Sequence, residues 1–276
     1  MSLKLSYNTW AYSSYPSWLP AYTLEETIKR LAAIGYDGIE IGAAGPHAYP
    51  PTLSERRRVE IKKVLDGEGI TLSSMLPAPS GGPVNNVSSP VEEERAYTTQ
   101  HYKDLIDLTA QWGGKTVIYI PGWIVFGTTR AQALEWSQQA LAELADYAAP
   151  QGIQLVIEPT SYDSNLIDTE HHAIELMQSV NRPNVGLMFD TFHVLYRREV
   201  NTDYVYTMGK DLRHIHMSEV RRLPPGHGEC DFPAIMQALK DIKFDGYVTM
   251  EIGFDRRDVE PDWFAREAFT YLKPLT

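Results

Sequence analysis

The sequence alternates short apolar runs with longer amphipathic stretches, and this pattern occurs eight times along 276 residues. The runs typical of β-strands cover residues 3–8, 38–41, 71–75, 116–120, 154–158, 185–190, 213–217 and 247–252. The stretches with helical periodicity cover residues 24–33, 54–66, 92–112, 131–149, 169–179, 203–210, 232–240 and 262–272. A regular strand–helix alternation predicts a parallel sheet covered by helices.

Eight such units in a chain of this length favour closure of the sheet into a (β/α)8 TIM barrel that occupies residues 1–276 as a single domain. A doubly wound open sheet is the alternative. Glycines at 35, 67, 113, 114 and 152 stand between a helix and the following strand, so we expect helix C-caps there. The Pro-, Gly- and Ser-rich segment 77–90 lies between a strand and its helix, where barrels carry active-site loops.

Composition excludes several classes of protein. The chain has 25 Lys and Arg against 36 Asp and Glu, a net charge of −11, which disfavours nucleic acid as a partner. No apolar run approaches the ~18 residues of a membrane span, and the first residues lack a signal-peptide pattern. Cys230 is the single cysteine and cannot form an internal disulfide. We therefore expect a soluble cytoplasmic protein.

Four titratable residues stand at the ends of four consecutive predicted strands: Glu158, Asp190, His216 and Glu251. In a parallel barrel the C-terminal ends of all strands meet at one face, so these side chains should converge. Taken singly, Glu251 fits a surface ion pair and His216 fits a hydrogen-bonded core histidine. Each is separated from the next by one strand–helix unit, which favours a shared pocket instead.

A divalent cation would relieve the repulsion between three crowded carboxylates. Three oxygen donors and one imidazole suit Mn²⁺, Mg²⁺ or Co²⁺ better than structural zinc, whose ligands are mostly thiolates and imidazoles. Of the two histidines in the seventh strand, we assign His216 to the pocket and expect His214 to face the surrounding helices.

Other polar and aromatic residues are expected around this centre. His193 follows Asp190 by three residues and would overhang the pocket, although a helix-start residue without a chemical role is the alternative. The first and last loops contribute aromatic residues suited to stacking on a polyhydroxylated ligand, or to ordinary loop packing: Trp10, Tyr12, Tyr15, Trp18 and Phe254.

These residues resemble the xylose-isomerase-like barrel superfamily. The matching motifs are Gly35 to Ile41, Ile157-Glu158-Pro159, Phe189 to His193, His214 to Glu219, Pro225 to Glu229, and Glu251. Within the superfamily, the chain is most similar to ketose 3-epimerases of the tagatose, psicose (allulose) and fructoselysine type. The resemblance spans essentially the whole chain and implies a sugar substrate and a dimer or tetramer.

The resemblance also implies individual roles. Glu158, Asp190, His216 and Glu251 would bind one divalent metal, with Mn²⁺ preferred and Mg²⁺ or Co²⁺ as alternatives. Glu158 and Glu251 would form the acid/base pair that inverts C3 of a ketose through a metal-stabilised enediolate. His193 and Arg222 match substrate-orienting residues of the family. Asp163 is the nearest equivalent of a substrate-binding glutamate, but it is one methylene shorter and offset by one residue, which leaves the preferred sugar open.

Related activities remain as alternatives. Aldose–ketose isomerases, hydroxypyruvate isomerases and inosose dehydratases use the same kind of metal site and acid/base residues. Apurinic-site endonucleases need further histidines, and the third and fourth strands end in Ser74-Met75 and Tyr119-Ile120 instead. A non-catalytic binding protein is disfavoured because all four ligand types are present.

Overall fold

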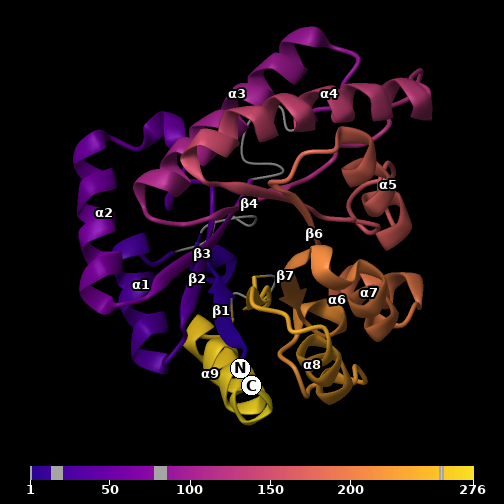
Figure 1. Cartoon of the computed structure of the whole chain (residues 1–276). Coiled ribbons are helices and arrows are strands. Elements are labelled where there is room, and N and C mark those ends of the chain that lie inside the picture. The colour runs from indigo at the N-terminus through magenta and orange to yellow at the C-terminus, as the bar shows by residue number, and fades with distance from the viewer. Residues whose placement is uncertain (1, 14–20, 78–85, 255, 257) are drawn as a thin grey trace.

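The computed structural model describes residues 2–13, 21–77, 86–254, 256 and 258–276, and its strands form a closed parallel barrel (Figure 1). The strands follow one another around the ring in sequence order, and β1 pairs with β8 to close it. They are β1 Lys4–Asn8, β2 Gly38–Gly42, β3 Thr71–Leu76, β4 Thr116–Tyr119, β5 Gln154–Ile157, β6 Val185–Asp190, β7 Leu212–Met217 and β8 Tyr247–Met250. The predicted (β/α)8 barrel is confirmed, and the open sheet is excluded.

Helices surround the barrel on its outer side (Figure 1). They are α1 Leu24–Ile34, α2 Glu55–Glu68, α3 Glu92–Gln111, α4 Arg130–Ala148, α5 Glu170–Val180, α6 Thr191–Arg197, α7 Asn201–Met208, α8 Phe232–Asp241 and α9 Pro261–Leu272. All eight predicted helices are present, with ends displaced by one or two residues. Among the described residues, none of these helices combines the length and apolar character needed to cross a membrane.

Helix ends follow local capping chemistry. The Thr23 side chain accepts a hydrogen bond from the Glu26 amide at the start of α1, and Gly35 ends that helix with φ +113°. The expected cap at Gly67 was wrong. Gly67 lies inside α2, and Gly69 ends the helix with φ +66°, a left-handed conformation that favours glycine.

Helix α6 was absent from the sequence prediction. Strand β6 ends at Asp190, and α6 begins at the next residue, without an intervening loop. The Asp190 carboxylate is itself the cap, because its Oδ1 accepts a hydrogen bond from the Phe192 amide at 2.8 Å. Asp190 is therefore both the last residue of β6, as the sequence pattern predicted, and the N-cap of α6.

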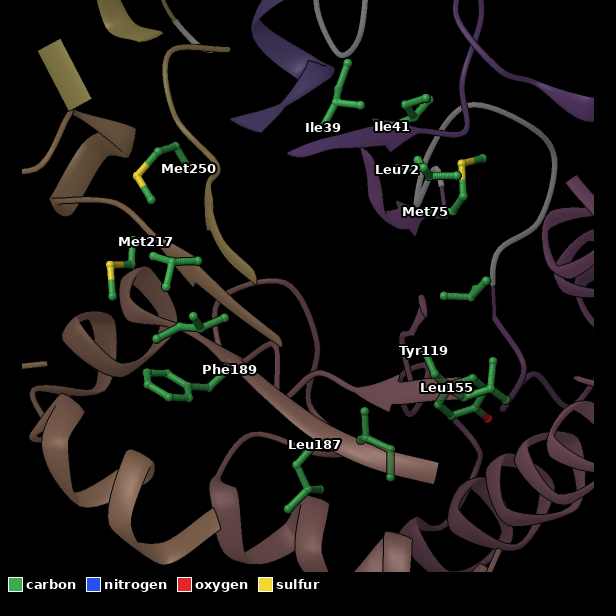
Figure 2. Close-up of a cluster of buried hydrophobic side chains, with 14 of the residues drawn as sticks. Ile39, Ile41, Leu72, Met75, Tyr119, Leu155, Leu187, Phe189, Met217 and Met250 are labelled. Carbon is green, nitrogen blue, oxygen red and sulfur yellow. The ribbon is translucent and has the colours of Figure 1, made fainter. Parts of the chain in front are cut away.

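Alternation along the strands separates two cores. Side chains at one parity point toward the helices and form the large apolar cluster between the sheet and the helical layer. Ten of its residues are labelled in Figure 2: Ile39, Ile41, Leu72, Met75, Tyr119, Leu155, Leu187, Phe189, Met217 and Met250. This apolar layer holds the strands in place and leaves the barrel interior for other side chains.

The barrel interior is apolar on one side and polar on the other. A small apolar cluster consists of Trp10, Ala44, Leu76, Ile118, Val156 and Met188. The buried polar residues are contributed mainly by β1, β2, β3 and the last strands, and include Ser6, Asn8, Glu40, Ser74, His214, His216 and Thr249. Buried polar groups of this kind require partners, so this side of the barrel has to contain a connected network.

A buried histidine in the loop after β2 gives the fold an expected pH dependence. His47 is 1% exposed, and its Nε2 lies 2.9 Å from the carbonyl oxygen of Tyr22. Burial lowers the pKa of His47 from 6.5 to about 4. The unfolded chain therefore takes up a proton at a higher pH than the folded protein does.

We expect this histidine to stabilise the fold fully above pH 6.5 and less as the pH falls from 6.5 toward 4. The loss from this group reaches about 3 kcal/mol. His47→Gln retains a donor for the Tyr22 carbonyl and does not titrate, so urea unfolding between pH 7 and pH 4 should show a shallower decline. His171→Gln, at a side chain that is 72% exposed, is the control. If the stability of His47→Gln falls with pH as steeply as that of the wild type, His47 is not the source of the pH dependence.

Candidate active site

The C-terminal ends of β5 to β8 bring four buried side chains together. Glu158 directly follows β5, Asp190 ends β6, His216 lies in β7, and Glu251 directly follows β8. Asp190 and His216 are fully buried, whereas Glu158 and Glu251 are 3% and 6% exposed. Sequence reasoning placed these four residues at one face of the barrel, and they lie there.

His216 stands at the centre of this group. Its Nδ1 lies 3.5 Å from Glu158 Oε1 and 3.3 Å from Glu251 Oε2. One ligand atom each from Asp190, His216 and Glu251 fits within 4.8 Å of the others, and so does one each from Glu158, Asp190 and His193. The spacing is compact enough for several of these atoms to contact a single ion.

The donor atoms fit a divalent cation. Nδ1 of His216 is buried and has no hydrogen-bond partner among the described residues. Nε2 of the same ring lies 2.9 Å from Glu40 Oε1 and 3.0 Å from Glu40 Oε2, so it donates its proton to that carboxylate. When the ring is neutral, this tautomer presents a lone pair at Nδ1 toward the carboxylates, which is the arrangement typical of metal-binding histidines.

Burial and crowding shift the pKa values of the group. Burial raises the pKa of Glu158 to about 7, and it also raises the pKa of Glu251 against the opposing effect of Arg222. Burial alone would lower the pKa of His216, but the carboxylates of Glu40 and Glu251 raise it well above its usual value. The common cause is excess negative charge in a buried space, and a cation would favour the ionised carboxylates.

Arg222 is the fixed positive charge beside these residues. Its Nη1 lies 2.8 Å from Glu251 Oε2 and also contacts Asp190 Oδ2. Burial raises the pKa of Asp190, but Arg222 reverses this effect and holds it below the usual value. The Arg222 guanidinium also lies 4.3 Å from the Phe192 ring centroid and 5.4 Å from that of Phe254. Asp190 is therefore ionised, and Arg222 is held between carboxylates and aromatic rings.

A buried hydrogen-bond network around Glu40 contacts His216 on the side of the ring that faces away from Glu158 and Glu251. Glu40 Oε2 accepts hydrogen bonds from Ser74 Oγ at 2.5 Å and lies 2.9 Å from His214 Nε2, while Asn8 Nδ2 donates to Glu40 Oε1 at 2.6 Å. The expectation that His214 faces the helices was wrong. Residues two apart on a strand share a face, so His214 points into the barrel with His216. Sequence reasoning assigned no role to Glu40, although its inward position between two isoleucines was the available signal.

A cavity of about 370 Å³ opens above the four converging residues. It is lined by Trp10, Leu76, Pro77, Ile120, Trp123, Glu158, Thr160, Asp163, Ser164, His193, Arg222, Glu251 and Phe254. All five residues proposed from the sequence for substrate contact are in this set. Trp10 can lie close to β2 because Gly42 has no side chain, since an added Cβ there would lie 2.3 Å from the Trp10 ring. The size falls in the range of small-molecule sites.

His193 and Asp163 face each other at the edge of this cavity. His193 Nδ1 accepts a hydrogen bond from the Tyr162 amide at 3.3 Å, and Nε2 lies 3.6 Å from Asp163 Oδ2. Burial lowers the pKa of His193 to about 3. The ring is thus neutral at pH 7, with its proton on Nε2, and can donate that proton to a ligand oxygen.

Some expectations concern residues outside this cavity or outside the described residues. Tyr12 is buried beneath the loop, where its hydroxyl donates to Asp262 Oδ1 at 2.8 Å. Tyr15, Trp18 and positions 78–85 of the predicted active-site loop lie outside the described residues. Sequence reasoning also did not identify Trp123 and Thr160 as cavity residues, because both lie in loops without a periodic pattern.

The chain matches known proteins over most of its length. Residues 28–275 match a family described as the xylose isomerase-like TIM barrel. A D-psicose 3-epimerase from Ruminiclostridium cellulolyticum is 31% identical over 232 residues, which cover 81% of this chain and 76% of the relative. A fructoselysine 3-epimerase from Shigella flexneri is 26% identical over 266 residues, which cover 91% of this chain and 93% of the relative.

The fold of the chain is also similar to that of a solved structure. A crystal structure of D-psicose 3-epimerase with D-tagatose, from Clostridium cellulolyticum H10, has a TM-score of 0.84 to this chain at 25% identity. The similarity covers 99% of both chains. The whole barrel, and not one part of it, therefore has a counterpart in that structure.

Proposed function

The chain belongs to the xylose isomerase-like TIM barrel family and is an isomerase of carbohydrates, and from this premise we propose that it inverts C3 of a ketose or ketose derivative. The observation that carries the proposal is the cluster of Glu158, Asp190, His216 and Glu251 beneath a cavity of sugar size. Relatives named as psicose and fructoselysine 3-epimerases support the same reaction class.

Glu158, Asp190, Glu251 and His216, through Nδ1, would hold one divalent cation. Three carboxylates and an imidazole suit Mn²⁺, and Mg²⁺ or Co²⁺ also fit this donor set. When bound, the cation would supply a Lewis acid that stabilises negative charge on substrate oxygens.

Two glutamates would move the C3 proton. Epimerisation next to a ketone requires one base to remove the proton and an acid on the opposite face to return one. Glu158 and Glu251 both line the cavity, and burial raises the pKa of each. Either carboxylate can therefore reach a sugar seated in the cavity, one as the base and the other as the acid.

The remaining cavity residues would orient the sugar and exclude water. Nε2 of neutral His193 donates to a substrate oxygen, and Asp163 accepts from a hydroxyl. Trp10, Trp123 and Phe254 present apolar faces on which C–H groups of a sugar stack. Exclusion of water strengthens the electrostatic interactions at the reacting carbon.

Incubation with ketoses in D₂O tests the proposal. Purified enzyme, stripped with EDTA and reloaded with Mn²⁺, should convert at least one ketose to its C3 epimer, with deuterium at C3 visible by NMR. The stripped enzyme is the control and should lose most of this exchange. Turnover of an inosose, without deuterium at C3 of any ketose, would contradict the proposed reaction.

A further inference from the structure

A second cavity of about 510 Å³ adjoins the active-site cavity. We call it the outer cavity, and it is lined by Tyr162, Asp163, Phe192, Leu195, Tyr196, Val220, Arg221, Arg222 and Phe254. Asp163, Arg222 and Phe254 line both cavities. A ligand seated over the four converging residues can therefore extend into the outer cavity.

The outer cavity has aromatic walls. Tyr162 makes edge contacts with Phe192 and Tyr196, at ring-centroid distances of 5.1 and 5.2 Å. Tyr162 and Tyr196 are nevertheless 59% and 58% exposed, and Val220 is 54% exposed. Large apolar side chains gathered around a hollow at the mouth of an active site are typical of a ligand contact.

Arg221 supplies a positive charge to the outer cavity. Its neighbour Arg222 is neutralised by Asp190 and Glu251, but Arg221 has no ion pair or hydrogen bond to its side chain within the described part of the chain. Both arginines have positive φ, 64° and 53°. Such a backbone is uncommon outside glycine and costs stability. Arg221 lines the outer cavity alone, whereas Arg222 lines both cavities.

We propose that the outer cavity binds an anionic substituent of the ketose, with Arg221 as the residue that recognises the anion. The stem of the substituent would pack against Tyr162 and Tyr196. A carboxylate and a phosphate share the chemistry that Arg221 recognises, because the planar guanidinium binds either in a bidentate manner. This inference rests on the proposed epimerase function and adds a substrate class to it: substituted ketoses that carry a negative charge.

Four probes test this proposal: D-fructose, its 1-phosphate, its 6-phosphate, and its 1-O-carboxymethyl ether. At least one anionic probe should exceed D-fructose in kcat/KM for deuterium incorporation at C3 by about tenfold or more. A gain for the carboxymethyl ether alone identifies a carboxylate as the anion, whereas a gain for a phosphate ester identifies phosphate. Equal kcat/KM for all four probes would overturn the proposal.

Arg221→Asn tests the residue, because asparagine tolerates positive φ and carries no charge. We expect the ratio of kcat/KM for the preferred anionic probe to that for D-fructose to fall about tenfold or more. Arg221→Lys should restore part of the ratio. Arg198→Asn is the matched control, since Arg198 is also an exposed arginine with φ 60° but does not line the outer cavity. An unchanged ratio in Arg221→Asn, or an equal fall in Arg198→Asn, would overturn the assignment.

Binding without turnover separates this inference from the proposed reaction. Saturation-transfer NMR on the protons of the substituent should show contact with the wild type and a weaker signal with Arg221→Asn. Contact in the absence of any deuterium at C3 would leave the outer cavity supported and the epimerase function contradicted. Deuterium at C3 of D-fructose, without contact to any substituent, would leave the epimerase function supported and the proposed role of the outer cavity contradicted.

Discussion

Glu251→Gln is expected to lower kcat for epimerisation by about 10²- to 10⁴-fold, the range of a lost general acid or base. Glutamine has nearly the shape of glutamate and keeps an oxygen near His216 Nδ1 and Arg222, but it cannot take or return a proton. If the two glutamates serve opposite faces of the sugar, one epimer should still exchange its C3 proton with D₂O through Glu158. We therefore expect NMR to show exchange of the C3 proton for deuterium without formation of the other epimer.

Two controls make that result specific. Glu158→Gln should show exchange in the other epimer, and Glu267→Gln, at a partly exposed residue of α9, should behave as wild type. Metal content and thermal unfolding have to be measured for each variant, because Glu251 is also a proposed ligand and contacts Arg222. Undiminished epimerisation by folded Glu251→Gln would remove Glu251 from the mechanism.

Glu40→Ala is expected to lower the free energy of unfolding by about 3–5 kcal/mol, the range for the loss of one partner from a buried charged network. The substitution would remove the acceptor shared by Asn8, Ser74, His214 and His216. Burial raises the pKa of Glu40, but the two histidines reverse this effect and hold it well below the usual value. The carboxylate is thus charged in the folded protein, and its partners depend on it. Urea unfolding with and without Mn²⁺ measures the change.

Glu40→Gln separates the role of Glu40 in stability from its role in the site. Glutamine fills the same space and still accepts from one histidine, so the loss of stability should be smaller than in Glu40→Ala. The tautomer of His216 would no longer be fixed, and Mn²⁺ affinity, measured by titration, should fall about 10- to 100-fold. Glu267→Ala is the surface control. Wild-type stability in Glu40→Ala would show that the network does not support the barrel.

Much of the fold could be predicted because strand and helix periodicities alternate without interruption. The ends of β6 and all but the outermost residues of the other strands agree with the sequence pattern. Helix α6 could not be predicted from capping signals, because its cap is Asp190, a residue that also ends a strand. Gly67 was mistaken for a cap because two glycines lie near the end of α2, and only the backbone conformation distinguishes Gly69 from it.

The strand-end rule located the candidate site, since it depends only on the parallel arrangement of the strands. It could not reveal what lies beneath the site. Glu40 is at the middle of β2 and contacts His214 and His216 across the barrel. These residues are far apart in the sequence, so a local sequence pattern cannot predict their contact. The outer cavity could not be predicted from the sequence either, because it depends on the positive φ of Arg221 and Arg222 and on segments that follow four different strands, β5 to β8.

The closure of the ring between β1 and β8 has a consequence for the order of assembly during folding. Asn8 and Glu40 come from the first two strands, whereas Glu158, Asp190, His216 and Glu251 come from the last four. In a nascent chain that has formed only its early strands, Glu40 is present but its partners His214 and His216 are not yet in place. We therefore expect tight Mn²⁺ binding to arise only when the last strand docks against the first, so that bound metal reports on completed closure of the barrel during refolding.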